Sequence, residues 1–200
     1  DGPAFSIRDF VTTDSDAWMF ISTRESQKDA LKPLLSLWMT IAIQAVLDLP
    51  PVHRERLWCF IDELPTLQKM DALQLALSNT RKYGNCMVIG LQNFAQLREI
   101  YGPNLAQTIV SLLQTKLLLR ISDGASARIL AELMGQAELD EKEETTSYGV
   151  SAQRDGVSVF ARRQLRDLVL SSEILTLPDM QGFLQIPGDY PVARVAYGYV

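Results

Sequence analysis

Two adjacent carboxylates, Asp62 and Glu63, stand at the end of an apolar run in the stretch "RLWCFIDELPTL", residues 56–67. An apolar run of this length, rich in aromatic residues, is typical of a buried β-strand. An open α/β sheet binds its ligands at the carboxyl ends of its strands, so the pair would lie where chemistry is done. The alternative is structural, because a strand that leads into a helix often ends in acidic residues that cap the helix.

The functional interpretation is a Walker B motif, in which four apolar residues precede Asp-Glu. In P-loop ATPases the Asp holds Mg²⁺, commonly through water, and a following Glu can take a proton from the water that attacks the γ-phosphate. Asp62 would then bind the ion and Glu63 would act on the water.

Gln92 and Arg81 are two further candidates. Gln92 ends the next strand-like run, "CMVIGLQ", where many RecA-like ATPases keep a residue that senses the γ-phosphate. Its alternative role is to cap the helix expected from Phe94, although Asn93 is the better capping residue. Arg81, in "NTRKYG", ends the preceding helix. It either complements the helix dipole or serves as an arginine finger toward a neighbouring subunit.

The elements that must position these residues follow an α/β rhythm. Strands are predicted at residues 17–22, 57–62, 86–92 and 116–122, with helices between them, including a long apolar one with Pro33 near its start. Apolar strands separated by helices predict a mostly parallel sheet sandwiched by helices. Residues 137–160 are polar and acidic, which predicts a protruding loop or hairpin, with a specific acidic docking site as the alternative. Runs 182–186 and 193–200 predict a C-terminal β-hairpin.

Composition is that of an ordinary globular domain: 200 residues, 47% apolar and 22% charged. A net charge of -5 argues against a chain that coats nucleic acid or membranes as a whole, while a local basic patch stays possible. The apolar run 34–49 falls short of the roughly 20 residues of a membrane span and is expected to be a buried helix. Other residues are expected to have structural roles: His53 in a solvated loop, Cys59 and Cys86 as buried thiols of a reducing compartment, and Trp18, Trp38 and Trp58 in the core.

Residues from about Phe5 to the C-terminal "LPDMQGFLQIPGDYPVARV" resemble the type IV coupling proteins of bacterial conjugation. The resemblance is most specific between Arg56 and Gly102, where "FIDEL", "RK-G" and "GLQ" occur in the order and at the spacing of that family. It implies a RecA-like P-loop NTPase fold that uses ATP and Mg²⁺. It makes Asp62 the Mg²⁺ residue, Glu63 the catalytic base, Gln92 the γ-phosphate sensor and Arg81 the finger in trans.

The resemblance further implies a hexameric motor at the cytoplasmic face of the bacterial inner membrane. Such a motor passes single-stranded DNA, with its relaxase, into a type IV secretion channel. The chain has no Gly-Lys pair and so no Walker A loop, and it begins "DGPAFS" without an initiator Met. We therefore expect residues 1–200 to be the C-terminal part of one motor domain. The Walker A half and the membrane anchor would lie outside the chain, and the chain alone is expected to be inactive.

The DNA contacts are less defined, and two other functions stay open. Arg154, Arg162, Arg163 and Arg166 are candidates for contacts to phosphates in a pore or to an adjacent subunit. A non-hydrolysing RecA-like module that docks secretion substrates would share the fold without the chemistry. An FtsK-type DNA translocase is the nearest competitor among the enzymes.

Overall fold

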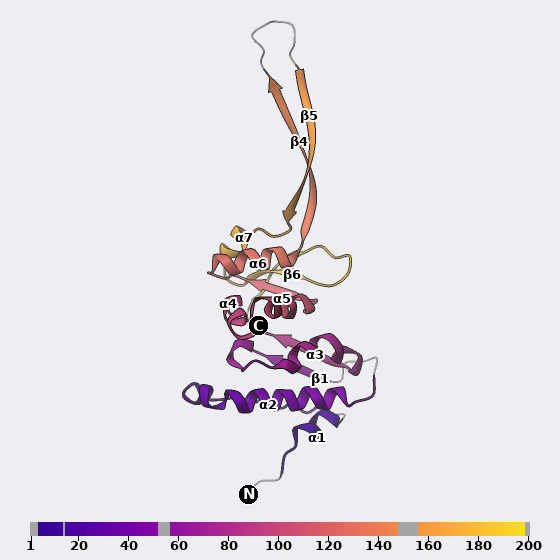
Figure 1. The fold of residues 1–200 in the computed structure, drawn as a ribbon, viewed down its shortest axis with the longest axis vertical. Coiled ribbons are helices and arrows are strands. Elements are labelled where there is room, and N and C mark those ends of the chain that lie inside the picture. The colour runs from indigo at the N-terminus through magenta and orange to yellow at the C-terminus, as the bar shows by residue number, and fades with distance from the viewer. Residues whose placement is uncertain (1–3, 14, 52–56, 148–155, 199–200) are drawn as a thin grey trace. The chain divides into compact units, whose positions relative to one another are not determined.

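The computed structural model describes residues 4–13, 15–51, 57–147 and 156–198, with only the backbone for 139–147 and 156–164. His53 and Arg154 lie outside the described residues. The chain divides into two compact units, residues 1–113 and 114–200, and each is described by itself (Figure 1).

The first unit is mainly helical around one pair of parallel strands, β1 and β2. Its elements are α1 (Ile7–Thr12), η1 (Glu25–Gln27), α2 (Lys28–Leu47), β1 (Leu57–Ile61), η2 (Leu64–Thr66), α3 (Asp71–Asn79), η3 (Thr80–Tyr83), β2 (Asn85–Ile89), α4 (Phe94–Tyr101) and α5 (Pro103–Leu112). The register of the strands runs from Leu57 opposite Asn85 to Ile61 opposite Ile89. The predicted alternation of strand and helix is confirmed from residue 57 onward.

The helices of the first unit end where the sequence predicts. Gly84 closes the α3–η3 segment with a φ of 79°, a left-handed conformation that glycine adopts without strain. The predicted break between α4 and α5 falls at Gly102 and Pro103. Fully buried leucines from η2, α3 and α4 (Leu64, Leu73 and Leu97) contribute to the core that holds these segments in place.

The predicted strand at residues 17–22 is wrong, because these residues have no strand assignment. Instead, the ring of Trp18 in this segment stacks beside Phe60 of β1, with the two ring centroids 6.1 Å apart. The expectation of a core position also fails for Trp18 and Trp58, which are 70% and 54% exposed. Phe60 is 57% exposed although Trp18 stacks beside it, and Trp38 is half-buried.

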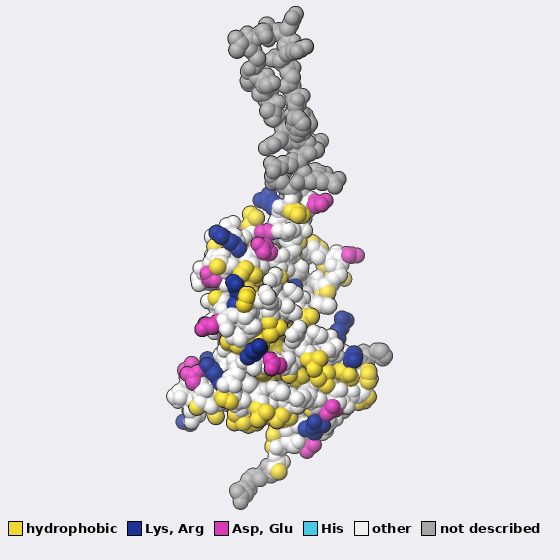
Figure 2. Space-filling view, viewed as in Figure 1, with side chains coloured by type: hydrophobic (Ala, Val, Ile, Leu, Met, Phe, Trp, Pro, Cys, Tyr) yellow, Lys and Arg dark blue, Asp and Glu magenta, His cyan; other side chains and the backbone are white. Residues whose placement is uncertain are grey.

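Helix α2 is less buried than its apolar sequence predicts. It is buried mainly in its C-terminal half, where Ala42, Ala45 and Val46 pack against Val11 of α1. Figure 2 shows apolar side chains at the surface along α2, and Leu37 is exposed. Among the described residues, Glu25–Leu47 is the one helix long and apolar enough to cross a membrane. Only 28% of its most apolar 18-residue stretch is buried. Length and composition alone do not separate such a span from a core helix of a soluble protein.

The second unit joins one three-stranded antiparallel sheet to a two-stranded ribbon. Its elements are β3 (Lys116–Leu119), α6 (Gly124–Met134), β4 (Gln136–Ser147), β5 (Gly156–Asp167), α7 (Ser171–Leu175), β6 (Gln181–Gln185) and β7 (Ala193–Ala196). The strand order is β3–β6–β7, and its core combines Leu118, Ala127, Met134, Ile174 and Phe183.

The sheet of the second unit corrects the prediction of a mostly parallel sheet. The C-terminal hairpin is present as β6 and β7, but β6 pairs antiparallel with β3, so parallel pairing among the described residues is confined to β1 and β2. Strands β4 and β5 pair over twelve residues each, from Gln136 opposite Asp167 to Ser147 opposite Gly156. The polar segment is therefore largely a β-hairpin.

Candidate functional site

Asp62 and Glu63 leave β1 at its carboxyl end, as the sequence predicts. The backbone of Gly90, just after β2, brackets the pair. Its N–H donates to the carbonyl of Ile61 at 2.7 Å, and its carbonyl accepts from the N–H of Leu64 at 3.1 Å. Leu64 is fully buried and anchors the chain directly after the pair. The side chain of Asp62 is exposed and that of Glu63 is half-buried.

The Glu63 carboxylate is only partly hydrogen-bonded. Its Oε1 accepts a long bond of 3.5 Å from the backbone N–H of Gln92. Its Oε2 is buried and has no hydrogen-bond partner among the described residues. A buried oxygen without a partner costs free energy, commonly about 1–3 kcal/mol, and in a native protein it calls for an explanation such as a catalytic role or a ligand. Glu63 is therefore not held as a helix cap would be.

Gln92 lies beside the carboxylates, and its side chain is exposed. The N-cap of α4 is Asn93, whose Oδ1 accepts from the N–H of Ala95 at 2.7 Å. Capping of α4 therefore does not account for Gln92. Asp62, Glu63 and Gln92 thus come together at the carboxyl ends of two adjacent parallel strands, the position at which open α/β sheets bind ligands.

Arg81 is not brought to this site. It is exposed on η3, which precedes β2, whereas Gln92 follows β2. The five residues of β2 span about 17 Å at the usual rise of a strand. Within one chain, Arg81 and the carboxylates therefore lie toward opposite ends of β2.

A buried polar network holds the turn that carries Arg81. The Thr80 hydroxyl donates to the carbonyl of Ala76 at 2.6 Å and accepts from Nδ2 of Asn85 at 2.9 Å. The thiol of Cys59 on β1 donates to Oδ1 of Asn85 at 3.4 Å. Burial, with a smaller contribution from Cys86, raises the pKa of Cys59 to about 11. The predicted burial is met only in part, because Cys59 and Cys86 are half-buried, and the raised pKa of Cys59 disfavours its reactive thiolate form.

The residues present suit Mg²⁺ and a nucleotide. Mg²⁺ is commonly bound through one or two carboxylates plus substrate phosphates, with waters completing the shell. No group of three or more potential metal-ligand residues is found in the part of the chain that the structure describes. The exposed carboxylate of Asp62 and the Glu63 carboxylate, whose Oε2 has no partner among the described residues, are suitable oxygen ligands for the ion.

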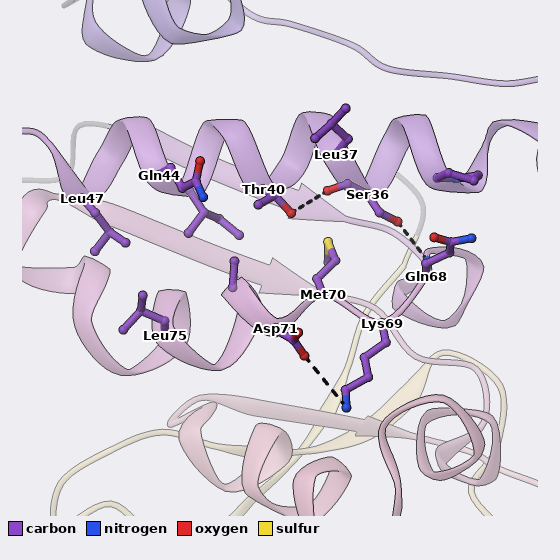
Figure 3. A pocket seen from close by; sticks show the side chains of 13 residues that line it. Ser36, Leu37, Thr40, Gln44, Leu47, Gln68, Lys69, Met70, Asp71 and Leu75 are labelled. Carbon is purple, nitrogen blue, oxygen red and sulfur yellow. Dashed lines mark hydrogen bonds and ion pairs between the residues drawn. The ribbon is translucent and has the colours of Figure 1, made fainter.

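A separate open groove of about 590 Å³ lies between α2 and the segment leading into α3 (Figure 3). Its wall is fixed by Ser36, whose Oγ accepts from the backbone N–H of Gln68 at 2.9 Å. Leu37, Leu47 and Leu75 supply its apolar lining. None of the predicted site residues lines this groove.

Three of the four candidate DNA contacts lie on β5. In the register of the hairpin, Arg162 is opposite Glu141 and Arg163 is opposite Asp140, while Arg166 is opposite Ala137 and exposed.

Sequence reasoning missed Gly90 and the Thr80–Asn85 network. A glycine directly after an apolar strand was the available signal for Gly90, because such a position often marks a close approach of two backbones. No local pattern indicates the bond from Asn85 to Thr80, since it depends on how η3 folds back onto β2.

Comparison with known proteins identifies the family. Residues 1–197 match the family described as type IV secretion-system coupling protein DNA-binding domain. The chain is 35% identical to coupling protein TraD of Escherichia coli (strain K12) over all of its length and 28% of TraD. It is 25% identical to a conjugal transfer protein TraG of Escherichia coli, over 96% of the chain and 32% of that protein.

Solved structures agree. The bacterial conjugative coupling protein TrwBdeltaN70 superposes with a TM-score of 0.81 at 32% identity, over 97% of this chain and 44% of that one. TrwB in complex with ADP and Mg²⁺ gives a TM-score of 0.80 at 31% identity, over 96% and 42%. The chain thus spans about a third or less of the curated relatives and under half of these structures. With a family match over nearly its whole length, the chain belongs to the type IV secretion-system coupling proteins.

Proposed function

We propose that this chain is part of an ATP-driven DNA translocase of conjugation, which couples a relaxosome to a type IV secretion channel. The observation that carries the proposal is the group of Asp62, Glu63 and Gln92 at the carboxyl ends of β1 and β2, with a buried Glu63 oxygen that no described residue hydrogen-bonds. Related TrwB structures that contain ADP and Mg²⁺, or a non-hydrolysable ATP analogue, support nucleotide chemistry in this family.

In this proposal each residue has a defined part. Asp62 would hold Mg²⁺, which when bound neutralises charge on the nucleotide phosphates. Glu63 would accept the proton of the attacking water at its carboxylate, whose Oε2 has no hydrogen-bond partner among the described residues. Gln92, whose backbone N–H contacts Glu63 and whose side chain is exposed, would orient the γ-phosphate or the water. The Walker A loop that must hold the phosphates would come from sequence outside these 200 residues.

Arg81 would act on the nucleotide of a neighbouring copy. The length of β2 separates it from the carboxylates of its own chain, and its exposed position leaves the guanidinium accessible to another subunit. An arginine supplied in trans stabilises charge on the transferring phosphoryl group. This role needs an oligomer, and we propose a hexamer at the cytoplasmic face of the inner membrane.

The test is single-stranded-DNA-stimulated ATP hydrolysis by the protein with its native flanking sequence, comparing wild type with Glu63→Gln. Loss of the proton acceptor predicts a fall in kcat on the order of 10² or more, with ATP binding kept. Glu99→Gln is the matched control, because Glu99 is an exposed carboxylate on α4. Hydrolysis at the wild-type rate in Glu63→Gln would refute the catalytic role of Glu63. Absence of hydrolysis in the assembled wild type would instead favour a docking module that does not hydrolyse ATP.

A further inference from the structure

Gly90 makes the closest approach to the carboxylate pair of any glycine with a described environment. A Cβ built at Gly90 would stand 1.9 Å from the backbone oxygen of Asp62 and 2.9 Å from its carbonyl carbon. Real Cβ atoms essentially never come within 3.0 Å of such an atom. The obstacle is backbone rather than the end of a flexible side chain. Any residue other than glycine therefore has to push the Asp62 peptide away.

The hydrogen bonds of Gly90 explain why the two backbones are so close. Its N–H and carbonyl bond to Ile61 and Leu64, the residues on either side of Asp62 and Glu63. Gly90, which directly follows the neighbouring strand β2, is therefore hydrogen-bonded on both sides of the two-residue segment Asp62–Glu63. Gln92 lies two residues after Gly90, so the same glycine also fixes the position of Asp62 and Glu63 relative to Gln92.

We propose that Gly90 is a positioning residue for Asp62 and Glu63, so that the absence of a side chain there is a requirement of hydrolysis. The inference rests on the proposed function of the pair and adds a residue that itself touches no substrate. Gly90 has no left-handed φ, so the requirement is for space and not for backbone conformation.

The size of the effect follows from the geometry. Relieving a 1.9 Å contact to at least 3.0 Å displaces the Asp62 peptide by about 1 Å or more. A misplacement of about 1 Å at reacting groups can lower a rate by about 10²-fold. Gly90→Ala is therefore expected to lower kcat on the order of 10²-fold, comparable to Glu63→Gln.

Two other glycines supply matched controls. A Cβ at Gly124 meets nothing within 4 Å, so Gly124→Ala tests the substitution without a contact. A Cβ at Gly182 would lie 2.9 Å from the backbone oxygen of Leu118, so Gly182→Ala tests a milder crowding between strands in the second unit. Both variants are expected to keep kcat within about 3-fold of wild type at temperatures where they are folded.

The decisive comparison is Gly90→Ala, Glu63→Gln and the double variant in the protein with its native flanking sequence, with ATP and single-stranded DNA. If Gly90 acts through the pair, the double variant falls no more than about 3-fold below Glu63→Gln, because residues that act as a unit are not additive. A loss of kcat in the double variant equal to the product of the two single losses would overturn the inference. So would wild-type hydrolysis by Gly90→Ala while Glu63→Gln is inactive. Wild-type hydrolysis by Glu63→Gln, in contrast, would refute the catalytic role of Glu63 in the proposed function itself.

Hydrogen exchange gives a readout that does not depend on activity. In Gly90→Ala, and not in Gly182→Ala, the amides of residues 61–64 are expected to exchange faster, because the bond from Leu64 to Gly90 is broken. If Gly90→Ala fails to fold, hydrogen exchange in the wild type still tests the inference. The amides of Gly90 and Leu64 are expected to be protected together, and exchange of either at the rate of a free amide would overturn the inference.

Discussion

The buried pair Thr80 and Asn85 offers a quantitative test of how the first unit holds its Arg81 turn. The two residues are 1% and 5% exposed and are joined by the 2.9 Å bond from Asn85 to the Thr80 hydroxyl. Thr80→Val keeps the shape of the side chain but leaves the Asn85 donor without its partner. Asn85→Ala removes the donor and also deprives the Cys59 thiol of its acceptor.

Each single substitution is expected to cost about 2 kcal/mol of unfolding free energy, the middle of the range for leaving a buried polar group unsatisfied or removing it. For a chain of this size that cost lowers Tm by about 4–8 °C. Because both changes break the same bond, the double variant is expected to be about 1 kcal/mol more stable than the sum of the single effects predicts.

Urea denaturation of the four proteins at 25 °C measures this coupling. Thr108→Val is the control, because Thr108 on α5 makes the same type of local bond, from Oγ1 to the carbonyl of Asn104 at 2.9 Å. Among the described residues, no side chain donates to it as Asn85 does to Thr80. This variant is expected to change the stability by less than about 0.5 kcal/mol. A coupling below about 0.3 kcal/mol would refute the proposed network as the support of the turn.

Two further predictions concern single titratable groups. In a Cys86→Ala background, Cys59 is expected to react with iodoacetamide more slowly at pH 8 than a thiol of pKa 9.0. Burial, the larger cause of its raised pKa, is kept in that variant, and the thiolate is the reactive form. A rate like that of an ordinary thiol contradicts this. Asp123 caps α6 by accepting from the N–H groups of Ala125 and Ser126, and bonds from Ser126 above all lower its pKa from 3.8. Because the folded pKa is the lower one, its contribution to stability is present above about pH 3.8 and lost below, as the folded carboxyl protonates. Asp123→Ala should therefore lower Tm at pH 7 and have a diminishing effect as the pH falls below 3.8, and a pH-independent difference in thermal melts would contradict that reasoning.

Local signals were enough to predict most of the helices. Gly84 and the Gly102-Pro103 pair set helix boundaries through backbone conformations that the residues themselves impose. The strand ending at Ile61 was equally clear, because its apolar run stops at two charges. The order of Asp62, Glu63 and Gln92 along the chain then indicated the candidate site, since parallel neighbours end at one edge.

Features that depend on distant partners could not be predicted in this way. Residues 17–22 have the apolar composition of a strand, yet a strand exists only where another backbone supplies its hydrogen bonds. The antiparallel pairing of β3 with β6 joins residues more than 60 positions apart, which periodicity does not encode. The close contact of Gly90 with Asp62 likewise becomes visible only when the register of β1 and β2 is known.

The exposed tryptophan rings on β1 and on the segment before α2 give the first unit an intrinsic fluorescence signal for binding. All three tryptophans of the chain, Trp18, Trp38 and Trp58, lie in this unit, and two of them are largely in water. Indole fluorescence shifts to shorter wavelength when the ring leaves water. Any polypeptide or nucleic acid that covers the face of β1 would thus be detected without a label, and its affinity could be read directly from the emission spectrum.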